Sequence, residues 1–223
     1  MALEGGASVS ALTYEAEAPR VGASLILGHG ASAGQRSPFI VAFAQALASR
    51  GVDVITFNFL YTEQHRRVPD RRPALEACYS AVIADVRGHV ASARDGLFIG
   101  GKSMGGRIAT HVAAADTNLP LKGLVMLGYP LHPPGRSDGR RDAHLPGVRR
   151  PMLIVQGSRD TFGTPHEFEP LLEQLSPTPT LHVVEGGDHS FKIARAGKAA
   201  QEAVYLDVQL TIVQWIAALT RTD

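Results

Sequence analysis

The segment GLFIGGKSMGGRIATHVAAA, residues 96–115, joins an apolar strand-like run to a helix-forming stretch at a single serine. Its central part, GKSMG at 101–105, matches the pattern G-x-S-x-G. The flanking glycines allow the chain to turn sharply between strand and helix, which exposes the serine hydroxyl. The helix N-terminus also directs backbone N–H groups at developing negative charge. The sequence therefore predicts that Ser103 is a nucleophile.

The same letters also spell the phosphate-loop pattern G-x-x-x-x-G-K-S over residues 96–103. In a phosphate loop, the strand precedes the first glycine and the next four residues wrap the phosphate with their amides. Here those four residues include Leu97, Phe98 and Ile99, which are themselves the predicted strand. The pattern thus favours the serine turn over a nucleotide site.

Short apolar runs alternate with longer segments of helical period along the rest of the chain. This alternation predicts an α/β fold with a mostly parallel central sheet flanked by helices. The expected strands are 23–29, 52–59, 96–101, 121–129, 151–157 and 180–186. The expected helices are 38–50, 73–94, 104–115, 165–175 and 198–219. Partial alternation over residues 8–18 indicates an edge strand.

The length of 223 residues fits one domain over residues 1–223, and a composition with 44% hydrophobic and 19% charged residues is typical of a globular chain. The stretch YPLHPPGRSDGRRDAHLPGVRR, residues 129–150, is rich in proline, glycine and charge. It predicts an irregular connection. The stretch is too short and too polar for a substantial cap domain.

The charge and the cysteine content limit which partners the protein could bind and in which compartment it is expected. The 22 basic and 21 acidic residues give a net charge of +1, which provides no broad field for nucleic acid or anionic lipid. Arginine pairs at 66/67, 71/72, 140/141 and 149/150 are interpreted as solvated loop charge, with steering of an anionic substrate as the open alternative. The single cysteine, Cys78, cannot form an internal disulfide. With neither a leader pattern nor an apolar stretch of about 20 residues, we expect a cytoplasmic protein without a membrane partner.

A serine hydroxyl needs a base to accept its proton, and His189 fits this role best among nine histidines. It follows the expected strand 180–186 in a glycine-rich loop. Asp160 follows the strand 151–157 and could fix the imidazole tautomer. Because the carboxyl ends of parallel strands gather at one rim, both side chains are expected near Ser103. The order serine, aspartate, histidine agrees with one of the known orders for such a triad.

Two other carboxylates remain open as the acid. Asp188 is a weaker candidate because a side chain adjacent to the base seldom reaches back to its ring, and Glu185 is a second fallback. The alternative for Asp160 is a turn-forming or capping role. The alternative for His189 is an ordinary loop histidine.

The oxyanion formed by attack on a carbonyl needs donors already in place. We predict the backbone N–H of Met104 as one donor and that of Ala31, in the turn GHGASAG (28–34), as the other. His29 is expected to brace this turn. The histidines show no metal-ligand spacing such as H-E-x-x-H, so neither a metal nor another cofactor is predicted.

These motifs together resemble the α/β-hydrolase superfamily, in particular its small dienelactone-hydrolase-like members. The combination GHGASAG, FNF, GGKSMGGRIA, GYPLHPPG, QGSRDTFGT and GGDHSF is most similar to an uncharacterised hydrolase-like group that includes the testis-expressed protein of animals and many bacterial homologues. The resemblance covers most of the chain. It implies the triad Ser103, Asp160 and His189 with oxyanion amides at Ala31 and Met104. Dienelactone hydrolases proper carry a cysteine nucleophile, which makes dienelactone a doubtful substrate.

The expected function is hydrolysis of a small carboxylic ester or thioester through an acyl-Ser103 intermediate, without a cofactor. The alternative is a hydrolase fold kept as a catalytically silent interaction module. Lys102 is either a buried ion-pair partner or a selector of an acidic substrate. Candidate substrate contacts follow the strands 52–59 and 121–129, with core packing as their alternative role. They are Asn58, Phe59, Tyr61, Tyr129, Leu131 and His132.

Overall fold

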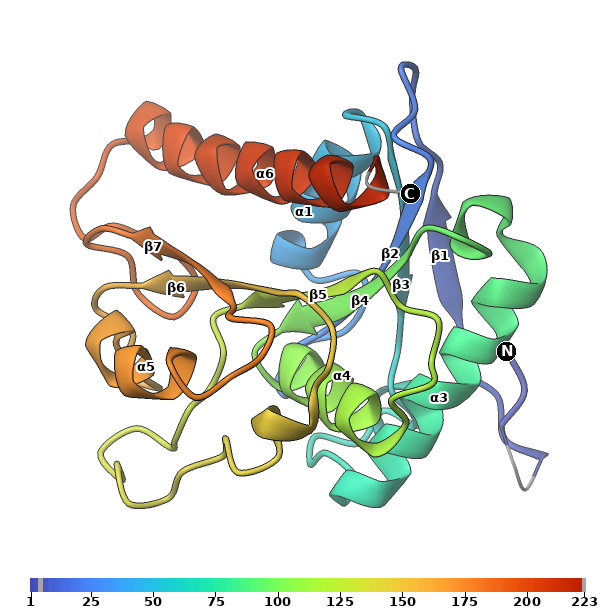
Figure 1. Ribbon diagram of the computed structural model, residues 1–223, viewed down its shortest axis with the longest axis horizontal. Coiled ribbons are helices and arrows are strands. Elements are labelled where there is room, and N and C mark those ends of the chain that lie inside the picture. Colours follow the sequence, from blue (N-terminus) through green and yellow to red (C-terminus); the bar gives the residue numbers. More distant parts are fainter. Residues whose placement is uncertain (4–5, 222–223) are drawn as a thin grey trace.

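The computed structural model describes residues 1–3 and 6–221. They form a seven-stranded sheet with helices on both faces (Figure 1). The strands are β1 Ala11–Tyr14, β2 Ala23–Gly28, β3 Val52–Phe57, β4 Leu97–Lys102, β5 Gly123–Leu127, β6 Met152–Gly157 and β7 Thr180–Val184. The helices are α1 Pro38–Ala48, α2 Leu60–Glu63, α3 Arg72–His89, α4 Met104–Ala115, α5 Pro165–Leu172 and α6 Lys198–Thr220.

The sheet order is β1-β3-β2-β4-β5-β6-β7, and only the edge pair β1–β3 among the named strands is antiparallel. After β2 the chain first pairs β3 on one side of it and then β4 on the other. The strand order thus reverses at β2, and the carboxyl ends of β2 and β4 lie side by side there. Such a switch point is where open α/β sheets place their ligand sites.

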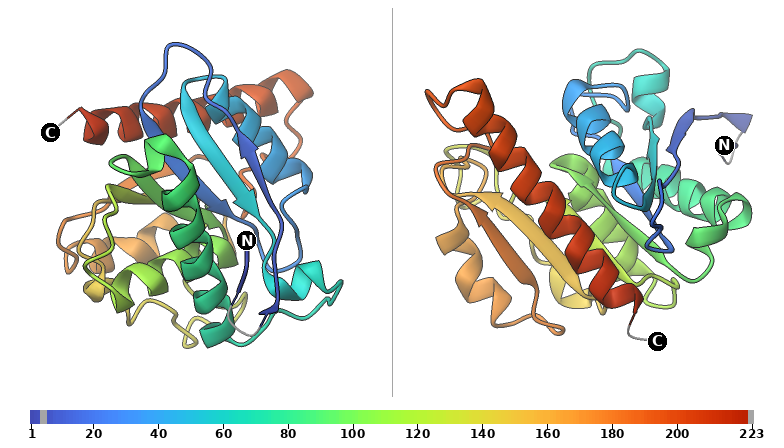
Figure 2. Two further views of the ribbon diagram at one scale, coloured as in Figure 1. Left: turned by 90° about the vertical axis from the view of Figure 1, so that its right-hand side faces the viewer. Right: turned by 90° about the horizontal axis from the view of Figure 1, so that it is seen from above.

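Alternating residues of the central strands feed two separate cores, because successive side chains on a strand point to opposite faces. Leu25 and Leu27 join the core under α1 and α6. Ile26, between them, joins the core under α3, α4 and α5. The two helical layers appear on opposite sides of the sheet in Figures 1 and 2. Strands buried on both faces explain the continuous apolar runs in the sequence.

The predicted elements are present, but several are shorter than predicted; the strands expected over 121–129 and 180–186 end at Leu127 and Val184, and the edge strand expected over 8–18 covers Ala11–Tyr14. The helix expected over 73–94 ends at His89, because the chain leaves helical geometry at Val90 and forms a 3-10 turn, Ala91–Ala93, that buries Ala93. The helix expected over 165–175 ends at Leu172, after which tight turns bring Leu175 into the core. The strand expected to reach residue 59 ends at Phe57, and α2 follows it.

Helix α6 is long and apolar enough to cross a membrane by length and composition alone. A core helix passes the same test, and α6 packs one side onto the sheet. Val208, Ile212 and Ile216 are fully buried in the core shared with α1.

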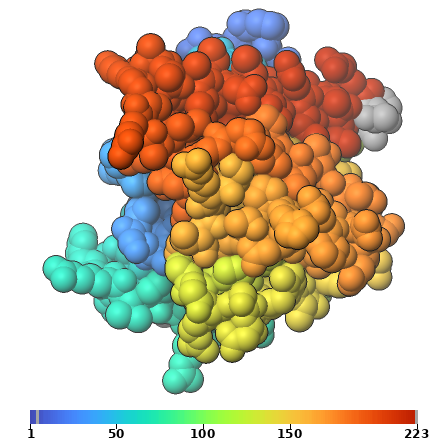
Figure 3. Space-filling model, turned by 90° about the vertical axis from the view of Figure 1, so that its left-hand side faces the viewer, coloured from blue at the N-terminus to red at the C-terminus, as the bar shows by residue number. Residues whose placement is uncertain are grey.

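The connection after β5 forms no cap domain. Between Leu127 and Met152 the described chain contains only the 3-10 turn Leu145–Gly147 and otherwise irregular structure. In the space-filling view this connection, in yellow-green, lies below the orange segments that follow β6 (Figure 3). The cyan segment after β3 lies beside it.

Candidate active site

Ser103 lies at the turn between β4 and α4 with φ 52° and ψ −114°. A non-glycine residue with positive φ is uncommon and costs backbone energy, so it persists only where its surroundings fix it. Two backbone hydrogen bonds hold this turn. The Ser103 N–H donates to the Leu127 carbonyl at 3.0 Å, and the Arg107 N–H donates to the Ser103 carbonyl at 3.1 Å.

The glycines around Ser103 are required by close packing of α4 against the end of β2. A Cβ at Gly105 would lie 2.3 Å from the carbonyl oxygen of Gly28, and one at Gly101 would lie 2.4 Å from the same atom. Real Cβ atoms do not approach backbone so closely. The G-x-S-x-G pattern therefore reflects steric contact with β2 as well as the turn itself.

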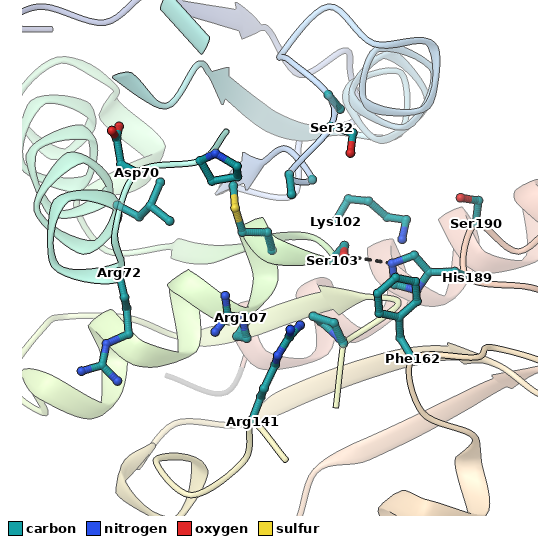
Figure 4. A pocket seen from close by; sticks show the side chains of 17 residues that line it. Ser32, Asp70, Arg72, Lys102, Ser103, Arg107, Arg141, Phe162, His189 and Ser190 are labelled. Atoms are coloured by element: carbon teal, nitrogen blue, oxygen red, sulfur yellow. Dashed lines mark hydrogen bonds between the residues drawn. The ribbon is translucent and has the colours of Figure 1, made fainter. Parts of the chain in front are cut away.

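The structure brings Ser103, His189 and Asp160 together in one hydrogen-bonded chain. His189 Nε2 lies 2.9 Å from Ser103 Oγ (Figure 4). His189 Nδ1 lies 2.7 Å from Asp160 Oδ2. The three residues follow β4, β7 and β6, so the parallel sheet delivers them to one rim. An imidazole placed between a hydroxyl and a carboxylate can accept the serine proton while the carboxylate steadies its charge.

Asp160 is almost completely buried, at 1% exposure. Its Oδ1 accepts the Phe162 N–H at 2.8 Å, and its Oδ2 accepts Gln156 Nε2 at 2.8 Å in addition to His189. These donors stabilise a buried carboxylate and fix its orientation. Gln156 also bonds the Gly163 carbonyl at 2.7 Å, which ties the turn that carries Asp160 to β6. Sequence reasoning missed Gln156 because a glutamine inside a strand gives no functional signal.

The two other carboxylates considered lie away from the imidazole nitrogens. Asp188 Oδ1 accepts the N–H groups of Ser190 at 2.7 Å and of Lys192 at 2.9 Å, which is a turn-forming role. Glu185 is exposed. Phe162 stacks on His189 with ring centroids 4.2 Å apart and covers one face of the imidazole. No sequence pattern singled out Phe162.

The predicted oxyanion donors line the same cavity as Ser103. Within residues 1–3 and 6–221, the N–H groups of Ala31 and Met104 donate to no protein acceptor. The Tyr61 hydroxyl donates to the Ala31 carbonyl at 2.8 Å and thereby holds this peptide in place. His29 braces the turn, since its Nδ1 lies 2.8 Å from the Gly30 carbonyl and its Nε2 accepts the Phe59 N–H at 3.1 Å.

The cavity beside Ser103 has a volume of about 460 Å³ and is open at the rim of the sheet. The residues that line this cavity are not the predicted substrate contacts, so that part of the prediction is wrong. Instead of those residues, the lining includes Arg72, Arg107, Arg141 and Phe162. The predicted contacts Asn58, Phe59, Tyr61, Tyr129, Leu131 and His132 are absent from it.

The apolar and tyrosine residues of that set instead pack behind the walls of the cavity. Phe59, Tyr61, Tyr129 and Leu131 are at most 1% exposed, because the chain turns inward after β3 and β5. The Tyr129 hydroxyl donates to the Arg141 carbonyl at 2.8 Å.

The two polar residues in that set also have structural partners. Asn58 Oδ1 accepts the Gln35 N–H at 2.8 Å. His132 Nε2 lies 2.9 Å from Glu167 Oε1, on α5. Both contacts join neighbouring segments around the site.

Lys102, the last residue of β4, is buried beside Ser103. Its Nζ has no hydrogen-bond partner and lies 5.8 Å from the centroid of Phe39. Burial lowers the pKa of Lys102 to about 8, against the attraction of Asp160 and Asp188. The sequence left two roles open for Lys102, an ion pair and selection of an acidic substrate. Among the described residues no carboxylate lies within 4.0 Å of its amine, so Lys102 forms no ion pair.

The described residues contain no group of three or more His, Cys, Asp or Glu side chains that could hold a metal ion. The groups placed for acyl transfer at this rim are the serine, the imidazole, the buried carboxylate and the free backbone amides. A serine at a strained strand–helix turn beside the switch point of this sheet, hydrogen-bonded to a histidine that follows the last strand, defines the class of α/β hydrolases.

Comparison with known proteins agrees with this class. The family model described as an alpha/beta hydrolase domain matches residues 21–217, and the chain therefore belongs to this family. Dienelactone hydrolase from Anabaena variabilis superposes with a TM-score of 0.73 at 19% identity, over 95% of this chain and 92% of that one.

Two further solved structures show the same fold. A serine hydrolase homologue from Coxiella burnetii gives a TM-score of 0.72 at 18% identity, over 92% of this chain and 90% of that one. A serine hydrolase without a lid from Xanthomonas campestris gives 0.69 at 23% identity, over 93% and 89% of the two chains. These similarities establish a dienelactone-hydrolase-like fold without a substantial cap.

Proposed function

We propose that this α/β hydrolase cleaves a small carboxylic ester or thioester through an acyl-Ser103 intermediate. The observation that carries the proposal is the continuous hydrogen-bonded chain from Ser103 Oγ through His189 to Asp160, with distances of 2.9 and 2.7 Å. The first distance allows proton transfer from Ser103 to His189, and the second lets Asp160 hold the imidazole by a hydrogen bond.

In the proposed reaction, His189 Nε2 accepts the Ser103 proton as Oγ attacks the carbonyl carbon. The N–H groups of Ala31 and Met104 stabilise the oxyanion. His189 then donates the proton to the leaving alkoxide or thiolate, which leaves an acyl ester on Ser103. Water, deprotonated by His189, hydrolyses that ester and returns the enzyme to its first state.

The size of the cavity supports a small substrate. A volume of about 460 Å³ lies within the range typical of small-molecule sites. No cap closes over it, so the substrate would enter directly from solvent. We also retain a cytoplasmic location as a proposal, since the described cysteine, Cys78, is buried and unpaired.

Labelling with a fluorophosphonate probe tests the proposal without knowledge of the substrate, because the probe captures activated serines. We expect labelling of the full chain at Ser103, and none in Ser103→Ala. The same variant should lose hydrolysis of p-nitrophenyl acetate while its circular-dichroism spectrum stays unchanged. Absence of labelling in the folded wild type would favour the alternative of a catalytically silent interaction module.

A further inference from the structure

A second hollow of about 420 Å³ adjoins the cavity at Ser103. Arg72, Arg107 and Arg141 line both spaces. We call this second hollow, with His111 and His144 on its wall, the arginine cleft. Figure 4 shows the guanidinium groups of Arg107 and Arg141 close to one another beside Ser103, whereas Arg72 extends outward from α3.

The carboxylates around the cleft are paired with arginines other than Arg107 and Arg141. Glu76 Oε1 lies 3.2 Å from Arg72 Nε, and Asp70 lies 2.6 Å from Arg66. Asp142 pairs with Arg140. In the part of the chain that the structure describes, neither Arg107 nor Arg141 makes an ion pair, although Glu76 exerts a weak attraction on Arg107.

Arg107 is also short of hydrogen bonds. Its Nε is buried without a partner. Desolvation lowers the pKa of Arg107, and the neighbouring charge of Arg141 lowers it further. A buried donor without an acceptor and two adjacent like charges are both unfavourable. A bound oxyanion would relieve both conditions at once.

The two histidines of the cleft are neutral, so its positive charge comes from the arginines. The His111 and His144 rings stack with centroids 3.4 Å apart. Burial is the main cause that lowers the pKa of His111 to about 3 and that of His144 to about 4, so both are neutral at pH 7. The positive field of Arg107 contributes to both shifts.

Arg107 lies in the first turn of α4, and its backbone N–H donates to the Ser103 carbonyl at 3.1 Å. Its side chain therefore starts close to the nucleophile and lines the same cavity. We propose that the arginine cleft binds a carboxylate or phosphate group of the substrate, held by Arg107 and Arg141, while the scissile carbonyl lies at Ser103. Planar guanidinium groups suit both oxyanions because they can bind two oxygens at once. This inference rests on the proposed hydrolase function and adds the substrate class.

Calorimetry on Ser103→Ala tests binding separately from catalysis. The probes are glutarate and inorganic phosphate, which distinguish a carboxylate from a phosphate ligand. We expect at least one to bind, and its affinity to fall at least tenfold when Arg107→Gln or Arg141→Gln is added. Arg141 lies on a loop, so its variant remains informative if Arg107→Gln fails to fold. Arg87→Gln, an exposed change on α3, is the matched charge control and should leave the affinity unchanged.

Turnover in the otherwise unchanged chain gives the second readout. We expect a higher kcat/KM for monoethyl glutarate, or for a phosphate-bearing ester if phosphate is the better ligand, than for ethyl butyrate. This preference should fall at least tenfold in Arg141→Gln and persist in Arg87→Gln. Failure of both anions to bind, or equal binding to the arginine variants, overturns the cleft assignment even if esters are cleaved. Anion binding without fluorophosphonate labelling or ester cleavage would instead overturn the proposed hydrolase function and leave the cleft standing.

Discussion

Single residues decide the electrostatics at this rim. Asp160 is a buried carboxylate whose oxygens accept bonds from His189, Gln156 and the Phe162 amide. Lys102, the residue before Ser103, is a buried amine without an acceptor. The hydrogen-bond donors around Asp160 stabilise its negative charge, whereas burial without an acceptor disfavours the positive charge of Lys102. Each difference leads to a measurable expectation.

Asp160→Asn should lower kcat for p-nitrophenyl acetate by about 10⁴-fold, because an amide favours the wrong imidazole tautomer and carries no charge to steady the imidazolium. Asp188→Asn and Glu185→Gln serve as controls, since neither carboxylate bonds the ring. Steady-state kinetics with the three variants would decide the matter. A damaging Asp188→Asn combined with an active Asp160→Asn would reassign the acid.

Lys102→Met should stabilise the protein at pH 7 by up to about 3 kcal/mol, because the pKa of Lys102 falls from 10.5 to about 8 on folding. Below pH 8 the folded state holds a charge that burial disfavours. Between pH 8 and 10.5 the folded state releases its proton first, so the wild type gains stability and the difference shrinks.

Urea unfolding at pH 7, 9 and 10.5 measures this difference directly. Lys198→Met is the control, because Lys198 is exposed on α6 and its side chain stays solvated. A difference between Lys102→Met and the wild type that does not change over this pH range would contradict the account.

At the scale of elements, the contact between α4 and the end of β2 sets the position of Ser103. Gly28 lies at the end of β2, and its carbonyl oxygen occupies the space that a Cβ at Gly101 or Gly105 would need. The helix can therefore begin directly after the serine, with its first N–H groups facing the cavity. Glycine at these positions controls how closely two elements approach.

Gly105→Ala should destabilise the protein by about 3 kcal/mol or more, since its Cβ would lie 2.3 Å from backbone that cannot yield. Gly88→Ala is the matched change in α3, where a Cβ meets nothing within 4 Å. That variant should be stabilised by about 0.5–1 kcal/mol through helix propensity. Thermal unfolding of both variants checks the pair. Similar effects of the two substitutions would show that α4 does not depend on this contact.

Across the whole molecule, two helical layers enclose the sheet and leave one rim free for chemistry. The layer of α1 and α6 includes a long apolar helix, α6, which buries Val208, Ile212 and Ile216. Its outer side carries Leu206 and Leu210, at 41% and 40% exposure. Replacement of a side chain by alanine should therefore lower folding stability more on the buried side of α6 than on its exposed side.

Ile212→Ala should cost about 2–5 kcal/mol of folding stability, because it removes fully buried atoms from the core beneath the sheet. Leu210→Ala should change stability by no more than about 0.5 kcal/mol. Chemical denaturation of the purified variants provides the comparison. Equal, small effects would mean that α6 does not contribute to this core as the structure shows.

The sequence determined the fold and the three residues that meet at the rim, because their signals are local. Continuous apolar runs specify strands buried on both faces, and G-x-S-x-G specifies a tight strand–helix turn. Ser103, Asp160 and His189 each lie in the connection after the carboxyl end of a strand, so the topology of a parallel sheet brings them to one rim.

The tertiary structure decided the walls of the site, because they depend on where loops turn and on which side chains they carry inward. Tyr61 and Tyr129 follow strands just as His189 does, yet the chain turns them into the core. Gln156 holds Asp160 from within a strand, where no motif marks it. Arg107 and Arg141 are 34 residues apart in sequence, and only the packing of the connection after β5 against α4 places them beside Ser103. Charge patterns along a chain do not reveal such proximity.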